Sequence, residues 1–249
     1  MGTMIELGEA PFPAYLSTPS GTASGAIILV HEVWGLVEHV KDVADRFAAE
    51  GYLVLAPDVL AGTGMTPEIA AELQLGLFNP DPRARNAAQP RLRELMAPIR
   101  APQFAASALV SLRECFDYLA VQGGVGGRIG VVGFCFGGTQ SFSLAVHEPR
   151  LRAAVPFYGH ADFTLEQLRD IRCPVLAFYG ERDTGLIEGL PALTRAMGDA
   201  GVDFRPQVYP DCGHAFFNDS NPFAYNADAA ALAWPATLDF LAETLTGRQ

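Results

Sequence analysis

A cysteine lies where a sharp turn would present it for nucleophilic chemistry. Cys135 is at the centre of the segment GFCFGG, residues 133–138, between a short apolar run and a helical pattern. A nucleophile among small residues at a strand-to-helix turn is typical of a nucleophile elbow, where most proteins carry serine. The N–H groups and the dipole at the start of the helix favour a thiolate. We therefore predict that Cys135 is a nucleophile, and the alternative is a buried structural cysteine in a glycine-rich turn.

Three other reactive side chains each follow an apolar run that we expect to be a strand: Glu32, Asp183 and His214. In a parallel sheet, ligands bind beyond the carboxyl ends of the strands, so these side chains should meet Cys135 there. The chain order of cysteine, aspartate and histidine is that of the catalytic triad in α/β-hydrolases. Taken singly, the aspartate also fits a turn or a helix cap, and the histidine a surface position. Their order and common position favour a triad in which His214 accepts the thiol proton and Asp183 orients His214.

The rest of the chain alternates apolar runs with helical patterns. We expect strands at 26–30, 52–56, 128–132, 153–158, 174–179 and 203–209, after extended pieces at 4–18. We expect helices at 37–50, 107–122, 139–146, 190–200 and 226–245. Residues 60–105 are less regular, with helical pieces at about 67–77 and 90–97, and form a long excursion over the sheet. This alternation predicts one α/β domain over residues 1–249, with a mainly parallel, doubly wound sheet and helices on both faces.

Composition excludes several classes of function. The chain has 249 residues, of which 49% are hydrophobic, and a formal net charge of −11. That charge argues against nucleic acid and against an anionic membrane surface, because cations are needed to replace phosphate counterions. The N-terminus lacks a signal pattern, and no apolar run reaches the length of a membrane span. The 4 cysteines lie far apart and suggest neither a zinc site nor a disulfide scaffold. We therefore expect a protein of the reducing cytoplasm.

The chain resembles the dienelactone hydrolase family in six segments: residues 31–35 (HEVWG), 56–58 (APD), 133–138 (GFCFGG), 158–159 (YG), 179–183 (YGERD) and 213–216 (GHAF). The similarity runs from about residue 5 to residue 245. The resemblance implies an α/β-hydrolase fold in which Cys135 is the nucleophile. It also implies that His214 is the base and later the acid, oriented by Asp183. Finally, it implies that Glu32 is an additional carboxylate that contacts the resting thiol.

The chemistry of a thiol nucleophile agrees with this resemblance. Attack on the carbonyl carbon of an ester or lactone places negative charge on the carbonyl oxygen. The backbone N–H groups of Phe136 and Val33 are the expected donors to that oxygen. Water activated by His214 would then hydrolyse the thioester. These steps need no metal and no organic cofactor.

Several residues close in sequence to these groups are predicted to bind the substrate: Trp34, Phe134, Tyr158, Phe216 and Asn218. The aromatic residues, together with Phe217, are alternatively ordinary core residues. The resemblance implies arginines that hold a substrate carboxylate, one of them four residues after the triad histidine, where this chain has Asn218. Candidates for another arginine are Arg83, Arg85 and Arg91. If none of these arginines folds back over the site, we expect neutral esters or lactones to be hydrolysed at least as well as carboxylate-bearing analogues.

The sequence as a whole predicts a cofactor-independent cysteine hydrolase of small carboxylic esters or lactones. A thioesterase or a general carboxylesterase is the alternative within the same class. A member of the fold that binds a small ligand or a partner without catalysis is the alternative from another class, because fold alone does not fix function. The expected partner is a small-molecule substrate, and the expected state is a monomer or a small homo-oligomer.

Overall fold

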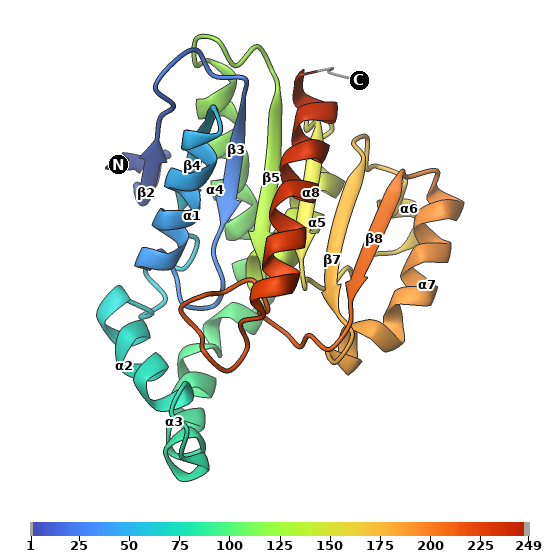
Figure 1. Cartoon of the computed structure of the whole chain (residues 1–249). Helices are drawn as coiled ribbons and strands as arrows, with labels where there is room; N and C mark the ends of the chain where they lie inside the picture. Colours follow the sequence, from blue (N-terminus) through green and yellow to red (C-terminus); the bar gives the residue numbers. More distant parts are fainter. Residues whose placement is uncertain (1, 247–249) are drawn as a thin grey trace.

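The computed structural model describes residues 2–246, and their strands form one 8-stranded sheet (Figure 1). Its order is β1-β2-β4-β3-β5-β6-β7-β8. The strands are β1 (Thr3–Leu7), β2 (Phe12–Ser17), β3 (Gly25–Val30), β4 (Tyr52–Pro57), β5 (Ile129–Phe134), β6 (Ala153–Phe157), β7 (Val175–Gly180) and β8 (Phe204–Tyr209). β1 and β2 pair antiparallel at one edge, and all pairs from β4 to β8 are parallel. The mainly parallel sheet predicted from the sequence is confirmed.

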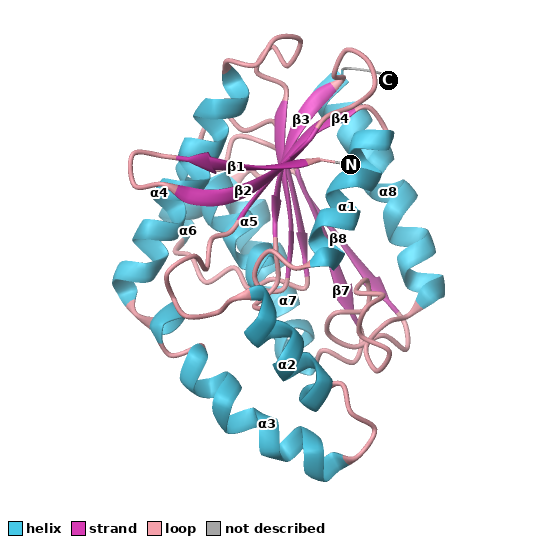
Figure 2. Cartoon of the chain, turned by 90° about the vertical axis from the view of Figure 1, so that its left-hand side faces the viewer, coloured by secondary structure: helices cyan, strands magenta, loops and turns pink. Residues whose placement is uncertain are grey.

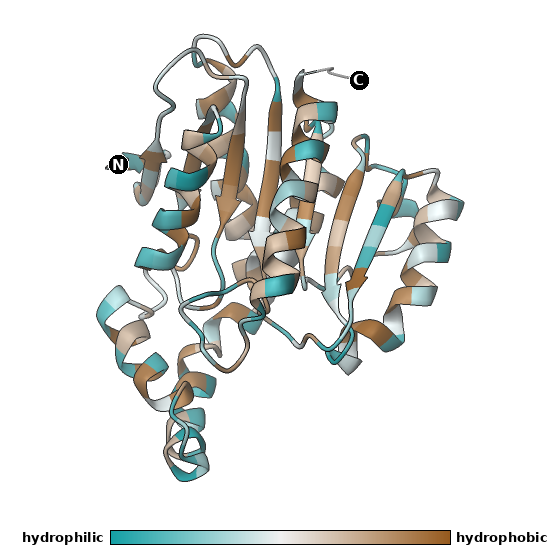
Figure 3. Cartoon of the chain, in the orientation of Figure 1, coloured by the Kyte–Doolittle hydropathy of each residue, from teal (hydrophilic) through white to brown (hydrophobic). Residues whose placement is uncertain are grey.

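The central strands are apolar throughout because both faces of the sheet are covered. Every residue of β3, β4, β5, β6 and β7 is buried. Figure 3 shows the same strands as the hydrophobic centre of the molecule, with hydrophilic residues gathered on the helices and loops around it. A continuous apolar run is the pattern expected of a parallel strand between two layers of helices.

Helices cover the sheet on both sides. They are α1 (Glu38–Ala49), α4 (Pro102–Ala120), α5 (Phe136–His147), α6 (Leu165–Leu168), α7 (Thr184–Ala200) and α8 (Ala227–Thr246). Figure 2 shows α1 and α8 on one face and α4 and α5 on the other. Phe47 of α1 packs on Trp234 of α8 with ring centroids 4.5 Å apart, which joins the helices of one face. Among the described helices, none combines the length and the apolar character required to span a membrane.

The excursion at residues 60–105 lies beyond the carboxyl ends of the parallel strands (Figure 1). It contains α2 (Pro67–Leu77), α3 (Pro82–Leu95) and the 3₁₀ turn η1 (Pro98–Arg100). A small apolar cluster of its own holds it together: Leu60, Met65, Ala70 and Leu73, with Trp34 and Phe136 packed against it. The excursion therefore sits over the end of the sheet where the candidate catalytic residues were predicted.

Four helices begin earlier than the sequence predicts, among them α5, which begins at residue 136 and not 139. α3 begins at residue 82 and not 90, α4 at 102 and not 107, and α7 at 184 and not 190. Proline explains two of these errors, because Pro90 and Pro191 lie inside helices, where proline is normally disfavoured. At the true starts of α3 and α4, proline occupies the first turn, where its missing N–H costs nothing.

Candidate active site

Cys135 lies on a strained turn between β5 and α5. Its backbone has φ 56° and ψ −112°, and it is the residue that immediately precedes the helix. Its N–H donates to the Phe157 carbonyl at 3.0 Å, and its own carbonyl accepts from the Thr139 N–H at 3.1 Å. A residue with a side chain adopts this left-handed backbone only when the surroundings enforce it, and such strain gathers at functional sites. The turn holds the thiol out beyond the end of the sheet, half-buried.

Close backbone contacts explain the glycines of the turn. A side chain at Gly137 would overlap the carbonyl groups of Val30 and His31, and one at Gly133 would overlap the carbonyl of Gly137. The start of α5 can therefore lie directly against the end of β3 only because these positions carry no Cβ. This contact brings Cys135 beside the loop that carries Glu32.

Replacing Gly137 with alanine should destabilise the fold by at least about 2 kcal/mol, because backbone atoms cannot move aside as a flexible side chain would. The free energy of unfolding in urea measures this effect. Gly198→Ala is the matched control, because Gly198 lies within α7 and a Cβ there would meet nothing within 4 Å. The control should gain about 0.5–1 kcal/mol from helix propensity. Equal stability of the Gly137→Ala protein and the wild type would contradict the packing argument.

His214 and Asp183 form a close pair next to the thiol. His214 Nδ1 lies 2.5 Å from Asp183 Oδ2, and the imidazole is 41% exposed. Asp183 follows β7 and precedes α7, whereas His214 lies in the loop after β8, so two neighbouring strands position the pair. Burial lowers the pKa of His214, but hydrogen bonds to Asp183 and Cys135 and the negative charges of both outweigh burial and raise it to about 10. The arrangement can therefore hold a proton between the thiol and the imidazole.

Glu32 is a buried carboxylate beside this pair, only 3% exposed. Its Oε2 accepts from Asn218 Nδ2 at 2.5 Å and its Oε1 accepts from the Tyr158 hydroxyl at 3.3 Å. Burial raises the pKa of Glu32, and the charges of His39 and His214 and these two hydrogen bonds oppose the rise. Within residues 2–246 the carboxylate makes these two side-chain hydrogen bonds. The contact of Glu32 with the resting thiol stays a prediction.

His31 fixes the loop that carries Glu32, a role that sequence analysis missed. The fully buried imidazole accepts a hydrogen bond at Nε2 from the Val59 N–H at 3.0 Å. Its Nδ1 must then carry the proton, and it donates to the Glu32 carbonyl at 2.6 Å. The ring also stacks on Phe136, with centroids 6.0 Å apart. The only signal in the sequence was the adjacency of histidine to glutamate at the end of a strand.

The two predicted oxyanion donors lie on the segments just described. Phe136 is the first residue of α5, where N–H groups have no acceptor within the helix. Val33 follows Glu32 in the loop after β3, which is held by His31. β3 and β5 are paired neighbours in the sheet. The loop after β3, which carries Val33, and the start of α5, which carries Phe136, therefore lie at the same end of the sheet as Cys135. Their role as an oxyanion hole is a proposal below.

The predicted substrate-binding aromatics divide into two groups. Phe134, Tyr158 and Phe216 are buried and pack on one another and on Phe157, as core residues do. Tyr158 also lies against His214, with ring centroids 5.0 Å apart, and its φ of 39° marks a second strained position of the site. Trp34 is half-buried, and its ring meets that of Phe78 edge-on with the centroids 5.6 Å apart. Because Phe78 directly follows α2, Trp34 lies on the side of the site that faces α2.

Asn218 and the arginines of the excursion have partners that the sequence did not suggest. Asn218 is 1% exposed, and besides its bond to Glu32 it accepts from the Ser220 hydroxyl at 2.6 Å. Arg85 donates to the carbonyls of Asn79 and Pro80, and Arg91 pairs with Glu94 on the surface. Arg83 is exposed. The predicted contact of Asn218 with substrate stays a prediction, and its observed partner is the carboxylate of Glu32.

The remaining thiols differ from Cys135. Cys115, Cys173 and Cys212 are buried and free, whereas Cys135 is half-buried. Burial raises the pKa of Cys173 to about 12 and that of Cys115 even further, so neither readily forms a thiolate. Among residues 2–246, no three histidine, cysteine, aspartate or glutamate side chains are grouped as ligands of a metal ion.

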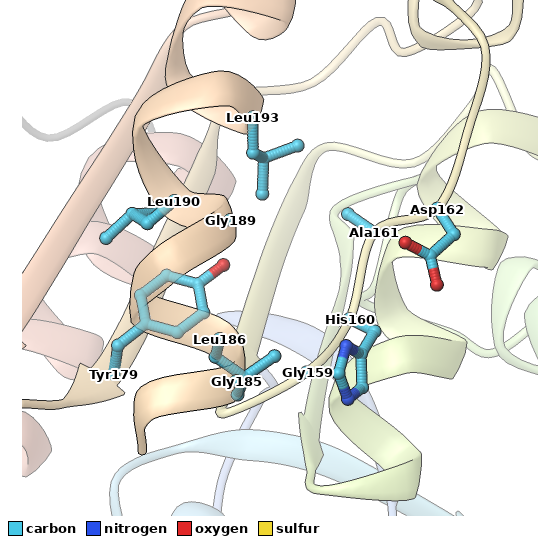
Figure 4. Close-up of a pocket in the computed structure, with 10 residues that line it drawn as sticks. All are labelled: Gly159, His160, Ala161, Asp162, Tyr179, Gly185, Leu186, Gly189, Leu190 and Leu193. Carbon is cyan, nitrogen blue, oxygen red and sulfur yellow. The ribbon is translucent and has the colours of Figure 1, made fainter. Parts of the chain in front are cut away.

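A small pocket lies between the start of α7, which follows Asp183, and the loop after β6 (Figure 4). Its volume is about 120 Å³. Leucine side chains of α7 form one wall, and His160 and Asp162 lie on the opposite side. The Tyr179 hydroxyl is buried there and has no hydrogen-bond partner within residues 2–246. Because Gly159 follows Tyr158 and Gly185 lies two residues after Asp183, the pocket borders the candidate active site.

The chain is similar to known proteins along almost its whole length. Residues 12–245 match the profile of the dienelactone hydrolase family. A protein of Saccharolobus solfataricus named "Putative carboxymethylenebutenolidase" is 31% identical over 93% of this chain and 94% of its own length. Protein usf of Aquifex pyrophilus is 30% identical over 99% of this chain and all of its own. The crystal structure of a Klebsiella pneumoniae protein described as a "Putative Dienelactone Hydrolase" superposes with a TM-score of 0.79, at 27% identity over 98% of both chains. The chain has the α/β-hydrolase fold and belongs to the dienelactone hydrolase family.

Proposed function

We propose that this protein hydrolyses small carboxylic esters or lactones through a thioester on Cys135. The observation that carries the proposal is the pairing of His214 with Asp183 at 2.5 Å, and the raised pKa of His214, to which Asp183 and Cys135 both contribute, supports it. A thiol on a strained elbow, a base beside it and an orienting carboxylate are the three parts of a nucleophilic triad. The names of the relatives support hydrolysis of a lactone or an ester.

The first half of the proposed reaction forms the acyl-enzyme. His214 takes the thiol proton, and the sulfur of Cys135 attacks the carbonyl carbon of the substrate. Negative charge on the carbonyl oxygen is stabilised by the N–H groups of Phe136 and Val33, each worth roughly 2–4 kcal/mol in such a site. The carbon–oxygen bond of the ester breaks, and His214 returns the proton to the leaving oxygen. Asp183 holds the imidazole in the tautomer that can do this.

The second half regenerates the thiol. His214 takes a proton from water as the water oxygen attacks the thioester carbon. The carbon–sulfur bond breaks, the carboxylic acid leaves, and the proton returns to the sulfur of Cys135. Each step uses only groups of this chain, the substrate and water.

Glu32 is proposed to control the proton on the thiol. Its carboxylate lies in a buried site between Asn218 and Tyr158, and its raised pKa makes it a better proton acceptor than an exposed glutamate. We assign Asn218 and Tyr158 a positioning role, since both donate to Glu32. The Tyr158 hydroxyl can only donate there, because burial and then the charges of Glu32 and Cys135 raise its pKa well above the ordinary value.

A pair of lactones, one neutral and one carrying a carboxylate, tests the proposed function. Both should be hydrolysed, and the neutral lactone should have a kcat/KM at least equal to that of the anionic one. The reason is that Asn218 offers a neutral amide where a guanidinium would clamp an anion, and that amide is already bonded to Glu32. Release of acid measured at constant pH gives both rates. A preference of about tenfold or more for the anionic lactone would contradict the expectation, and hydrolysis of thioesters alone would replace the proposal with a thioesterase.

A further inference from the structure

A groove lies between α2 and the loop that leads into α8. Its narrow part, about 210 Å³, is lined by Val37, Glu38, His39, Pro67, Ala71, Gln74 and Ser220. Its wide part, about 470 Å³, is lined by Ala71, Gln74, Leu75, Phe78, Asn79, Pro80, Ser220 and Pro222. Ala71, Gln74 and Ser220 line both parts, which are therefore adjacent. We call the two parts together the α2 groove. Figure 1 shows the loop before α8 extending towards α2.

Two buried polar atoms in the narrow part lack a partner. His39 Nε2 and Gln74 Nε2 have no hydrogen-bond partner within residues 2–246. His39 is 9% exposed, and its Nδ1 is fixed by Asp219 at 2.9 Å. Because a carboxylate can only accept, Nδ1 carries the proton and Nε2 is left for another partner. A buried polar atom without a partner costs free energy, and both residues line the narrow part, so a ligand group that reached these atoms would remove that cost.

A hydroxyl is the group that fits both atoms. Its oxygen can accept from the Gln74 amide, and its hydrogen can be donated to the neutral His39 ring. If His39 is protonated, the same oxygen can accept from both side chains. An anionic group is disfavoured, because Asp219 contacts His39 and the buried carboxylate of Glu32 interacts with its charge.

The wide part of the groove suits an apolar chain. Leu75 is 78% exposed along it, and Phe78 and two prolines complete its wall. Phe223 is also exposed, in the same loop as Pro222. Exposed apolar side chains gathered along a concave surface are typical of a ligand site.

The groove is tied to the catalytic residues at two points. Phe78, in its wall, meets Trp34, which follows Val33 in the loop after β3. Ser220 donates to Asn218 Oδ1, and Asn218 donates to Glu32. Ser220 is thus linked to the carboxylate of Glu32 through one residue, Asn218, and Phe78 is linked to it through Trp34 and Val33.

We propose that the α2 groove is a specificity subsite that binds the apolar chain of the substrate and its terminal hydroxyl, the hydroxyl bonding to His39 Nε2 and Gln74 Nε2. This inference rests on the proposed function, because the ester group of the same molecule would lie at Cys135. It assigns the substrate class as hydroxylated aliphatic esters, or the corresponding lactones.

Hydrolysis of three p-nitrophenyl esters tests the subsite: the hexanoate, the ω-hydroxyhexanoate and the adipate half-ester. The wild type should favour the hydroxylated ester over the unsubstituted ester by about tenfold in kcat/KM, since an apolar site without polar partners would disfavour a hydroxyl. Gln74→Leu and His39→Leu should each remove most of that preference. Gln74→Leu keeps the volume of a half-exposed helix position and carries the test if His39→Leu fails to fold.

Tyr179→Phe is the matched control. It also deletes a buried polar atom that lacks a partner within residues 2–246, but in the separate pocket beside Asp183. Its preference among the three esters should equal that of the wild type. Equal rates for the two uncharged esters in the wild type would overturn the proposal and indicate that water fills the groove. A preference for the adipate half-ester, or a hydroxyl preference unchanged in Gln74→Leu, would also overturn it.

Binding to the Cys135→Ala protein separates this inference from the proposed function. Calorimetric titration with ethyl ω-hydroxyhexanoate and ethyl hexanoate should show the same preference of about tenfold without turnover. If the wild type hydrolyses no ester but this preference is present and is lost in the Cys135→Ala, Gln74→Leu double variant, the groove stands and the proposed chemistry fails. If esters are hydrolysed through Cys135 with no hydroxyl preference in binding or rate, the groove fails and the chemistry stands.

Discussion

Cys135→Ala should lower kcat for a small ester by at least about 10⁴-fold while the protein stays folded. The loss should be that large because the residue removed is the proposed bond-forming atom, and His214 alone offers only general-base assistance to water. The fold should persist because the substitution removes only the sulfur. The backbone of the turn between Gly133 and Gly137 and the β-carbon at position 135 stay unchanged. Steady-state hydrolysis of p-nitrophenyl acetate, with circular dichroism of the same sample, measures both quantities.

The other cysteines provide the controls for this result. Cys115→Ala, Cys173→Ala and Cys212→Ala should retain most of the activity, because these thiols are buried and burial raises the pKa of each. Any effect of these substitutions should appear in the melting temperature. Near-normal hydrolysis by Cys135→Ala, or a comparable loss in one of the three controls, would rule out Cys135 as the nucleophile.

Glu32→Gln should lower kcat/KM by roughly 10²–10⁴-fold, the usual contribution of a proton acceptor. The same change should make the stability of the protein less dependent on pH. Burial raises the pKa of Glu32 above its ordinary value, so the folded protein holds this proton more tightly than the unfolded chain. Glu32 therefore subtracts from stability as the pH rises above about 4.5, the value at which the carboxyl ionises in the unfolded chain. An amide of the same shape does not ionise and so removes this pH-dependent penalty, while its NH2 group cannot accept one of the two hydrogen bonds that Glu32 accepts.

Melting temperatures at about pH 5 and about pH 8 test the sign of this effect. The advantage of Glu32→Gln over the wild type should be larger at the higher pH. Glu72→Gln, at an exposed position of α2, is the control and should change neither activity nor the pH dependence of melting. Full activity in Glu32→Gln, or an advantage that shrinks as the pH rises, would contradict the role given to this carboxylate.

The sequence could identify the catalytic candidates because Cys135 directly follows a strand and Asp183 and His214 come a few residues after the ends of two others. Apolar runs mark buried parallel strands, and the carboxyl ends of such strands must meet. Cys135, Asp183 and His214 therefore lie at the same end of the sheet wherever the strands pair in this order, and the loops after β7 and β8 bring His214 against Asp183. The elbow glycines were recognisable for the same local reason.

Contacts between distant loops and helices could not be predicted in this way. Asn218 meets Glu32 across 186 residues, and His39 meets Asp219 across 180. Neither pair shares a periodicity or a turn motif, because tertiary packing alone brings α1, α2 and the loop before α8 together. The α2 groove and the buried surroundings of Glu32 are consequences of that packing. The role of His31 was hidden for a related reason, since its partners are backbone atoms of Glu32 and Val59.

The acyl-enzyme itself gives the most direct test of the central claim. Wild-type protein mixed with p-nitrophenyl acetate, quenched in acid within the first turnover and digested, should yield one acetylated peptide containing Cys135. The acetyl group should be removed by neutral hydroxylamine, as expected of a thioester, and its formation should match a burst of p-nitrophenol. Turnover without any modified Cys135 peptide, or acetylation of a different residue at the rate of the burst, would contradict covalent catalysis by this thiol.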